Sequence, residues 1–288
     1  MTKMALNPNQ ERFHEDLPQL AVENFAIANR TCQSCGHMHA LWPYIRLARA
    51  STGIEGASSD LDRILHELIA EGHRKVLIAG SQDTGLMALV ARAAGSGAVE
   101  ITVLDRCATP LESCRRLAQV WSLPIETTQR DLMHLEVKNR FDIVLVHQTL
   151  HYIPLDRRVD VLVRLRQALR PGGVLVMMFN IGNRLVGKLA SEGRNHYASW
   201  VIEELQHLGV PLPEEHEAFA ARLSVHAANR ENREGAYSQP KEVQELLAQS
   251  GFDVRQCFES GVKLANPMQD FVSKLSKRRF LVVAEAHV

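Results

Sequence analysis

One stretch, from Lys75 to Ala93, constrains the fold more than any other part of the chain. It begins with an aliphatic run of the kind found in buried strands, and it passes through a polar turn bracketed by Gly80 and Gly85. It ends in a segment whose apolar residues recur at helical spacing. Strand, glycine turn and helix in this order are typical of the ligand-binding end of a doubly wound sheet. The turn lacks the G-x-G-x-x-G pattern of dinucleotide enzymes, so this stretch alone does not name the ligand.

Strand and helix patterns alternate after this stretch, which predicts a mostly parallel sheet covered by helices on both faces. We expect further strands at 99–105, in a short region closing at 131–132, at 141–148, at 174–179, and as a final pair at 252–258 and 280–284. We expect helices over 61–69, 110–120, 159–169 and 240–249, with a turn at residues 171–173.

Two regions depart from the alternation. Residues 1–60 predict a helical lid, and residues 181–237 predict a cap inserted after the fifth strand, with helices near 200–208 and 214–223 and a polar loop at 228–235. The core then covers 61–180, and 238–288 complete its sheet. The predicted architecture is α/β: a doubly wound, mostly parallel seven-stranded sheet with a lid and a cap.

Composition limits the classes of partner. Lys and Arg number 33 and Asp and Glu also number 33, so net charge gives no support for a nucleic-acid substrate. No segment is long and apolar enough to predict a membrane span, which indicates a cytoplasmic protein without a membrane partner. The odd number of cysteines, five, favours reduced thiols over a disulfide framework. The sequence leaves open whether the chain forms a homodimer.

Four pieces together resemble a known family. They are the glycine turn at 76–80 and 84–85, Asp105 at a strand end, residues 141–144 with 150–152, and the Arg-Pro-Gly-Gly motif inside 169–175. In this order they resemble the class I S-adenosylmethionine-dependent methyltransferases, over residues 61–180 and more weakly over the final helix and strand pair. The resemblance implies S-adenosylmethionine as cofactor and S-adenosylhomocysteine as product.

The resemblance also implies roles for individual residues. Gly80, Ser81 and Gly85 would approach the methionine and adenosine parts of the cofactor, and Asp105 would accept hydrogen bonds from both ribose hydroxyls. The alternative for Asp105 is an ordinary aspartate in a turn after a strand.

The adenine ring has its own candidates. Asp131 and Leu132 match the position that contacts this ring, although Asp131 could equally cap a helix or turn. The cofactor candidates are completed by residues that follow the second strand or end the fourth: Arg106, His147 and Gln148.

The glycine turn departs from the family pattern. Ile78 stands where an acidic residue is usual, and Gln82 and Asp83 replace the middle glycine. Asp83 is the candidate carboxylate for the cofactor's ammonium group or for an ordered water, or else a cap for the following helix. The departure keeps open a degenerate fold that binds without catalysing.

Methyl transfer is an in-line displacement, so a base is required only if the acceptor loses a proton. His147 and His151 lie at and just after the end of the fourth strand, where they would face the methyl group. The alternatives are a polar contact to the cofactor for His147 and packing for His151.

The segment before the core is unusual in composition. Cys32, Cys35, His37 and His39 could supply four zinc ligands. Structural zinc sites take ligand pairs from separated turns, however, and no distant second pair is evident, so the sequence favours no metal.

A better-supported interpretation of the same segment is a wall of the substrate pocket. His39, Trp42, Tyr44 and Arg46 are the candidates, with Arg46 pairing a carboxylate. Trp42 and Tyr44 could instead anchor a docking helix in a core. Asn180, at the end of the fifth strand, is a further substrate candidate.

These features favour a biosynthetic methyltransferase whose acceptor is an oxygen, nitrogen or activated carbon of a small molecule. Two alternatives remain. One is a degenerate fold that serves as a binding or regulatory subunit. The other is a nicotinamide oxidoreductase, which the missing fingerprint glycines disfavour.

Overall fold

The structure, a computed structural model, describes residues 8–32, 35–48, 58–95, 97–181, 191–231, 237–261 and 278–287. Among the described residues, no helix is both long and apolar enough to cross a membrane.

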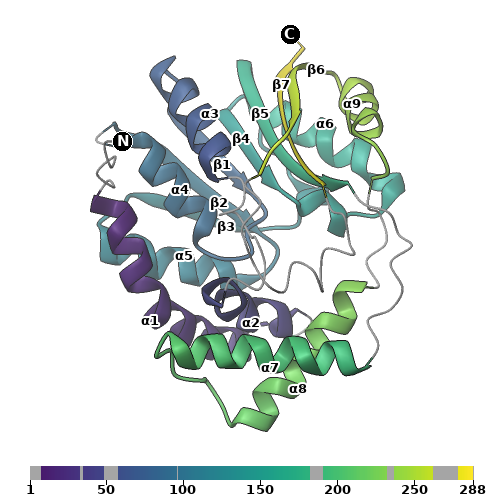
Figure 1. Ribbon diagram of the computed structural model, residues 1–288. Helices are drawn as coiled ribbons and strands as arrows, with labels where there is room; N and C mark the ends of the chain where they lie inside the picture. Colours follow the sequence, from purple (N-terminus) through teal and green to yellow (C-terminus); the bar gives the residue numbers. More distant parts are fainter. Residues whose placement is uncertain are drawn as a thin grey trace, which may run out of the picture.

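A seven-stranded sheet forms the centre of the chain (Figure 1). Its strands, in the order β3-β2-β1-β4-β5-β7-β6, are Ile125–Gln129, Glu100–Asp105, Lys75–Ala79, Phe141–His147, Leu169–Ile181, Arg278–Ala286 and Phe252–Glu259. The strands β1 to β5 are parallel, and β7 runs antiparallel to both of its neighbours. The predicted fold class is confirmed, and the predicted final strand pair is present and antiparallel. The strand order reverses between β1 and β4, and ligands of such sheets bind at that position, beyond the carboxyl ends of the strands.

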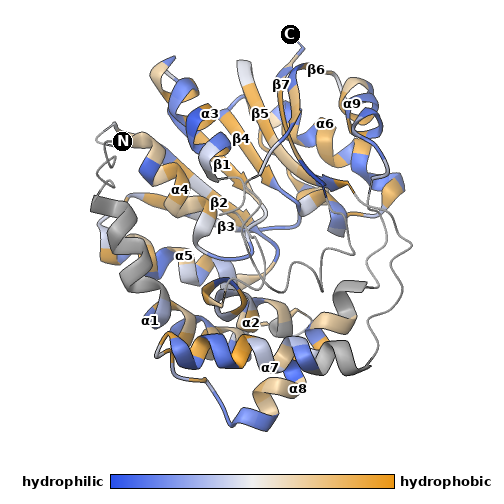
Figure 2. Cartoon of the chain, viewed as in Figure 1, coloured by the Kyte–Doolittle hydropathy of each residue, from blue (hydrophilic) through white to orange (hydrophobic). Residues whose placement is uncertain are grey.

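Helices cover both faces of the sheet because each carries an apolar stripe at helical spacing. One face is covered by α3 (Ser58–Ala70), α4 (Gly85–Ala94) and α5 (Ala108–Trp121). The other is covered by α6 (Arg158–Ala168) and α9 (Pro240–Gln249). The inner strands and the covering helix faces are correspondingly hydrophobic (Figure 2). Short 3₁₀ helices follow β3 and β4, at Leu132–His134, Thr149–Tyr152 and Leu155–Arg157.

A separate helical layer lies beyond the carboxyl ends of the strands (Figure 1). It consists of α1 (Pro8–Thr31), α2 (Gly36–Leu47), α7 (Ser191–His207) and α8 (His216–Glu231), which share one hydrophobic core. Phe25, Tyr44 and Phe219 meet edge to face there, with ring centroids 5.3 to 6.4 Å apart. The lid and the cap that we predicted as separate segments therefore pack as one unit.

Two local predictions were wrong. The predicted polar loop begins inside a helix, because α8 continues to Glu231; residues 232–236 lie outside the described residues. The predicted turn at residues 171–173 lies within β5. Leu169 already pairs with Phe141, the register then shifts, and Val174 pairs with Ile143. Gly172, at φ +76°, provides the backbone conformation that this irregularity needs.

Candidate active site

The glycine turn follows β1 and requires glycine at its first position. Gly80 has φ +86°, and its N–H donates to the Leu104 carbonyl at 2.8 Å. A Cβ atom there would come within 2.5 Å of the Thr149 side chain. The Thr149 hydroxyl donates to the Ala79 carbonyl at 3.1 Å, and this hydrogen bond joins the ends of β1 and β4. Any larger residue would push these two strand ends apart.

Asp105 ends β2 beside this turn. One carboxylate oxygen accepts the Ser81 N–H at 2.8 Å and the other accepts the Cys107 N–H at 2.7 Å. Burial raises the pKa of Asp105, and the two backbone hydrogen bonds oppose that rise. Each oxygen keeps acceptor capacity beyond its single backbone bond. The carboxylate is therefore held in place with both oxygens able to accept a further hydrogen bond.

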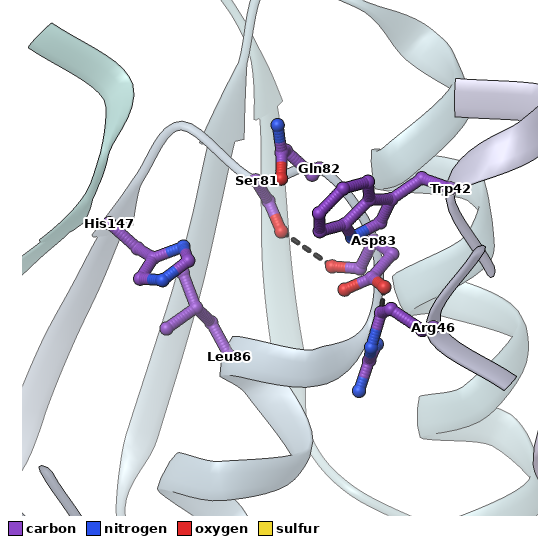
Figure 3. A pocket seen from close by; sticks show the side chains of 7 residues that line it. All are labelled: Trp42, Arg46, Ser81, Gln82, Asp83, Leu86 and His147. Carbon is purple, nitrogen blue, oxygen red and sulfur yellow. Dashed lines mark hydrogen bonds and ion pairs between the residues drawn. The ribbon is translucent and has the colours of Figure 1, made fainter. Parts of the chain in front are cut away.

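Asp83 links the turn to the helical layer. One of its oxygens accepts the Gly85 N–H at 2.8 Å, and the other forms an ion pair with Arg46 of α2 (Figure 3). The Arg46 side chain is only 1% exposed and that of Asp83 is 10% exposed. A Cβ atom on Gly85 would lie 2.9 Å from the Arg46 guanidinium, so glycine permits this close approach. The predicted carboxylate partner of Arg46 is thus present within the chain itself.

A pocket lies between α2, the glycine turn and the end of β4. Its cavity volume is only about 10 Å³, roughly the room that one water molecule needs and far below the roughly 300–1,000 Å³ of typical small-molecule sites. Its lining residues come from these elements and from the first turn of α4 (Figure 3): Trp42, Arg46, Ser81, Gln82, Asp83, Leu86 and His147. Admission of a large cofactor requires α2 to move or its side chains to rotate.

His147 belongs to this pocket. Within the described part of the chain, its Nε2 is shielded from solvent and has no hydrogen-bond partner, although the residue as a whole is half-buried. Burial and the positive charges of Arg279, Arg46 and His151 lower the pKa of His147 to about 3. The imidazole is therefore neutral at physiological pH.

His151 lies outside the set that lines the pocket. Its Nε2 accepts the Asn180 N–H at 3.4 Å, and its ring packs against Tyr237 with centroids 5.7 Å apart. Asn180, the substrate candidate at the end of β5, is thereby connected to His151 rather than to the pocket. Asn183 and Arg184, in the predicted cap, fall outside the described residues.

Other predicted site residues have different surroundings. Asp131 accepts the Met133 N–H at 2.9 Å and so caps the 3₁₀ helix after β3, the alternative we had kept open. Leu132 is buried in the core, and Arg106 is exposed. Gln148 is half-buried, with φ +55°, and its N–H donates to the Met178 carbonyl at 2.9 Å.

Two residues predicted to wall the pocket lie elsewhere. Tyr44 is fully buried in the core of the helical layer, and this burial raises the pKa of its hydroxyl. His39 lies with its ring against the Cys32 sulfur. Trp42, three positions after His39, and Arg46, two positions after Tyr44, do line the pocket.

The sequence interpretation missed three residues near the site. Leu86 and Gln82 line the pocket, and the Gln82 amide donates to the Tyr152 hydroxyl at 3.1 Å. Only their position, shortly after the first glycine of the turn, could have indicated that these two residues line the pocket. Cys107, two residues after Asp105, was also missed, and it reaches the Cys32 sulfur at 2.8 Å.

Comparison with known proteins agrees with this geometry. A family model described as a methyltransferase domain matches residues 76–173, from β1 to the Arg-Pro-Gly-Gly motif. Residues 76–173 form a class I methyltransferase domain.

Curated relatives of the methyltransferase domain are distant. A protein named carboxy-S-adenosyl-L-methionine synthase from Actinobacillus pleuropneumoniae serotype 5b (strain L20) is 24% identical over 147 residues, which are 50% of this chain and 60% of the relative. The chain thus spans less than two thirds of the relatives' length.

Solved structures share the fold of the methyltransferase domain. A geranyl diphosphate methyltransferase in complex with SAM matches with a TM-score of 0.50 and 12% identity, over 80% of this chain and 85% of that one. A 1,6-didemethyltoxoflavin N1-methyltransferase from Burkholderia thailandensis, with 1,6-didemethyltoxoflavin and S-adenosylhomocysteine bound, matches with a TM-score of 0.50 and 18% identity, over 80% of this chain and 78% of that one.

Proposed function

We propose that this chain is an S-adenosylmethionine-dependent methyltransferase that methylates an oxygen, nitrogen or activated carbon of a small molecule. The observation that carries the proposal is the Asp105 carboxylate, held by the Ser81 and Cys107 N–H groups beside a turn that requires Gly80. A ribose presents two neighbouring hydroxyl donors, and two carboxylate oxygens can accept both of them. The matching methyltransferase domain covers the same elements.

The Arg46–Asp83 pair supports a site for the methionine end of the cofactor. That end carries an ammonium group and a carboxylate, and the pocket offers one side chain of each opposite sign. Insertion of the zwitterion would exchange one ion pair for two, so neither buried charge would be left unpaired. This exchange takes over the role that the family gives to an acid at the position of Ile78.

Catalysis by this arrangement would consist mainly of alignment. A sulfonium methyl group transfers in line, so the chain has to hold the acceptor, the methyl carbon and the sulfur on one axis and exclude water. Trp42 and Leu86 supply apolar walls for this purpose. S-adenosylmethionine provides the methyl group and the leaving sulfur.

His147 is the better candidate for a base, because it lines the pocket and His151 does not. A neutral imidazole with a pKa of about 3 can accept a hydrogen bond but is a weak base. It favours an acceptor whose proton is already acidic, or one that needs no base at all.

The size of the acceptor is limited by the helical layer. This layer lies over the carboxyl ends of the strands, and with its α2 in place the pocket has a cavity of only about 10 Å³. A narrow, covered site suits a small molecule better than a polymer. The zero formal net charge points the same way, since a nucleic-acid substrate requires basic surface.

A second candidate is a fold that binds the cofactor or another small molecule without catalysing. It is favoured by the Arg46–Asp83 pair itself, which occupies the wall where the methionine end would enter. The two proposals differ in whether methyl transfer follows binding.

Calorimetric titration of the whole chain with S-adenosylmethionine and S-adenosylhomocysteine tests the proposal. We expect binding of both by the wild type, and about tenfold or weaker affinity in Arg46→Met, which removes a charged hydrogen bond worth roughly 1.5–3 kcal/mol. Arg157→Met is the control, because Arg157 is exposed, pairs with Asp160 and does not line the pocket. If the wild type bound neither compound, the proposed methyltransferase activity would be refuted. Binding of NAD in their place would favour an oxidoreductase.

A further inference from the structure

A cluster of three cysteines and one histidine lies where the helical layer meets the sheet. Cys32 and Cys35 come from the connection between α1 and α2, His39 from the first turn of α2, and Cys107 from the junction of β2 and α5. Their sulfur atoms and a ring nitrogen all lie within 4.8 Å of one another. The Cys32 sulfur is 2.7 Å from that of Cys35, 2.8 Å from that of Cys107 and 3.3 Å from Nδ1 of His39.

Both halves of the cluster are held by other contacts. The Cys107 N–H donates to Asp105, which fixes that cysteine at the end of β2. The Thr31 and Thr109 hydroxyls are 2.9 Å apart, which joins the end of α1 to the start of α5. The Asn24 amide donates to the His39 carbonyl and fixes the start of α2. The convergence of the four ligand atoms is therefore supported from both sides.

We propose that Cys32, Cys35, His39 and Cys107 bind one zinc ion. Three thiolates and one imidazole are a common structural zinc set, with ligands supplied by two separated chain segments. Soft sulfur ligands and the absence of carboxylates from the set select zinc over magnesium or calcium. Cys107 is the distant ligand whose apparent lack made the sequence favour no metal; the earlier candidate His37 is not needed.

The dimensions of the cluster suit this ion. Zinc–sulfur bonds of about 2.3 Å place tetrahedral sulfur ligands about 3.8 Å apart. The sulfurs at 2.7 and 2.8 Å would separate by about 1 Å around the ion, a change that rotation of the cysteine side chains can supply. His39 and Cys107 are buried and the other two are half-buried, so the site is shielded from bulk water.

The proposed zinc is structural, because four protein ligands leave no position for substrate. The role of the ion follows from its position between the helical layer and the end of β2. The ion would tie α1 and α2 to the residue that follows the Asp105 loop, and so hold Trp42 and Arg46 at the pocket. Zinc binding does not depend on methyl transfer, so the two proposals can fail separately.

Metal analysis of the untagged chain, purified under reducing conditions without chelator, tests the site. We expect about one zinc per wild-type chain, and less than about a tenth of that in Cys32→Ser and Cys107→Ser. Cys257→Ser is the matched control, because this half-buried cysteine lies on β6 and outside the cluster, and we expect it to keep its zinc. His39→Cys should also keep zinc, and His39→Ala should lose it.

Cobalt substitution distinguishes specific binding from adventitious metal. The wild type should show intense visible bands of tetrahedral cobalt with a thiolate charge-transfer band, and Cys35→Ser should lose both while its circular dichroism remains native. Less than about a tenth of an equivalent of zinc in the wild type after zinc addition overturns the proposal. Full zinc content in Cys107→Ser, or a disulfide within the cluster found by mass spectrometry of the unreduced chain, also overturns it.

Discussion

Asp105 and Asp142 each accept two backbone hydrogen bonds, yet they stand at opposite edges of the same sheet. Asp105 accepts from Ser81 and Cys107 at the carboxyl edge. Asp142, at the amino edge of β4, accepts from Arg74 and Lys75 at 2.8 Å each and pairs with Arg170 at 3.3 Å. The bonding pattern is shared, but the environments differ in burial and in charge.

The pKa values of the two carboxyl groups shift in opposite directions. Burial raises the pKa of Asp105. At Asp142 burial also acts to raise the pKa, but the two backbone hydrogen bonds and the positive charges of Arg170 and His73 lower it overall. Asp142 is paired within the chain and stabilises the sheet. Among the described residues, Asp105 accepts hydrogen bonds only from backbone N–H groups. Its remaining acceptor capacity suits a carboxylate that binds the hydroxyl donors of a ligand.

The largest expected effect is a loss of cofactor affinity when Asp105 is replaced. Asp105→Ala should weaken binding of S-adenosylhomocysteine by about 100-fold or more, because two hydrogen bonds to a charged group are lost at roughly 1.5–3 kcal/mol each. Asp142→Ala should change that affinity by less than about threefold, since it lies at the far edge. Calorimetric titration measures both. Equal losses in the two variants would show that sheet integrity, and not ribose recognition, sets the affinity.

The next effect concerns the two ends of β4, which carries Asp142 near its start and His147 at its end. With a pKa of about 3, His147 should stay neutral from roughly pH 5 to 9. Nuclear magnetic resonance of the histidine ring nitrogens, assigned with His147→Asn, measures this. Once the acceptor has been identified, kcat can be measured. If His147 is the base, His147→Asn should lower kcat by about 100-fold, and replacement of the exposed His134 by Asn should leave kcat unchanged. A His147 ring that titrates near neutral pH contradicts the burial argument.

The smallest effect concerns stability at the amino edge. The pKa of Asp142 is lowered on folding from 3.8, so its carboxylate stabilises the fold above the unfolded pKa and loses that effect as pH falls through the folded pKa. Asp142→Asn should reduce the free energy of unfolding by about 1–2 kcal/mol near pH 7, and the difference should shrink below about pH 4. Denaturant unfolding at a series of pH values measures it. A difference that is constant with pH would assign the loss to packing.

Local pattern was sufficient to predict the sheet. The run from Val76 to Ala79, the turn at Gly80 and the strand-end Asp105 carry their signal within a few residues, and each lies where it was expected. The bulge in β5 was missed because Arg-Pro-Gly-Gly is equally compatible with a turn, and only pairing with Phe141 decides between them.

The candidate site was harder to predict, because it depends on contacts between distant segments. The Arg46–Asp83 pair spans 37 residues and the Cys32–Cys107 contact spans 75. The local sequence around each residue gives no sign of its distant partner. Tyr44 shows the same limit, since an aromatic residue on an amphipathic helix fits a pocket wall and a helical core equally well, and the position of Phe219 decided for the core.

The shared core of α1, α2, α7 and α8 has a consequence for the order of events during synthesis. The first two helices leave the ribosome early, but the residues that cover their apolar faces, such as Val201 and Phe219, are added only after the first five strands. Until then Phe25 and Tyr44 remain without those partners, and contacts between such distant segments form slowly. The nascent chain therefore passes through a stage in which β1 to β5 have been made but α1 and α2 lack the helices that cover them, and their exposed apolar residues then favour binding by chaperones, proteolysis and self-association.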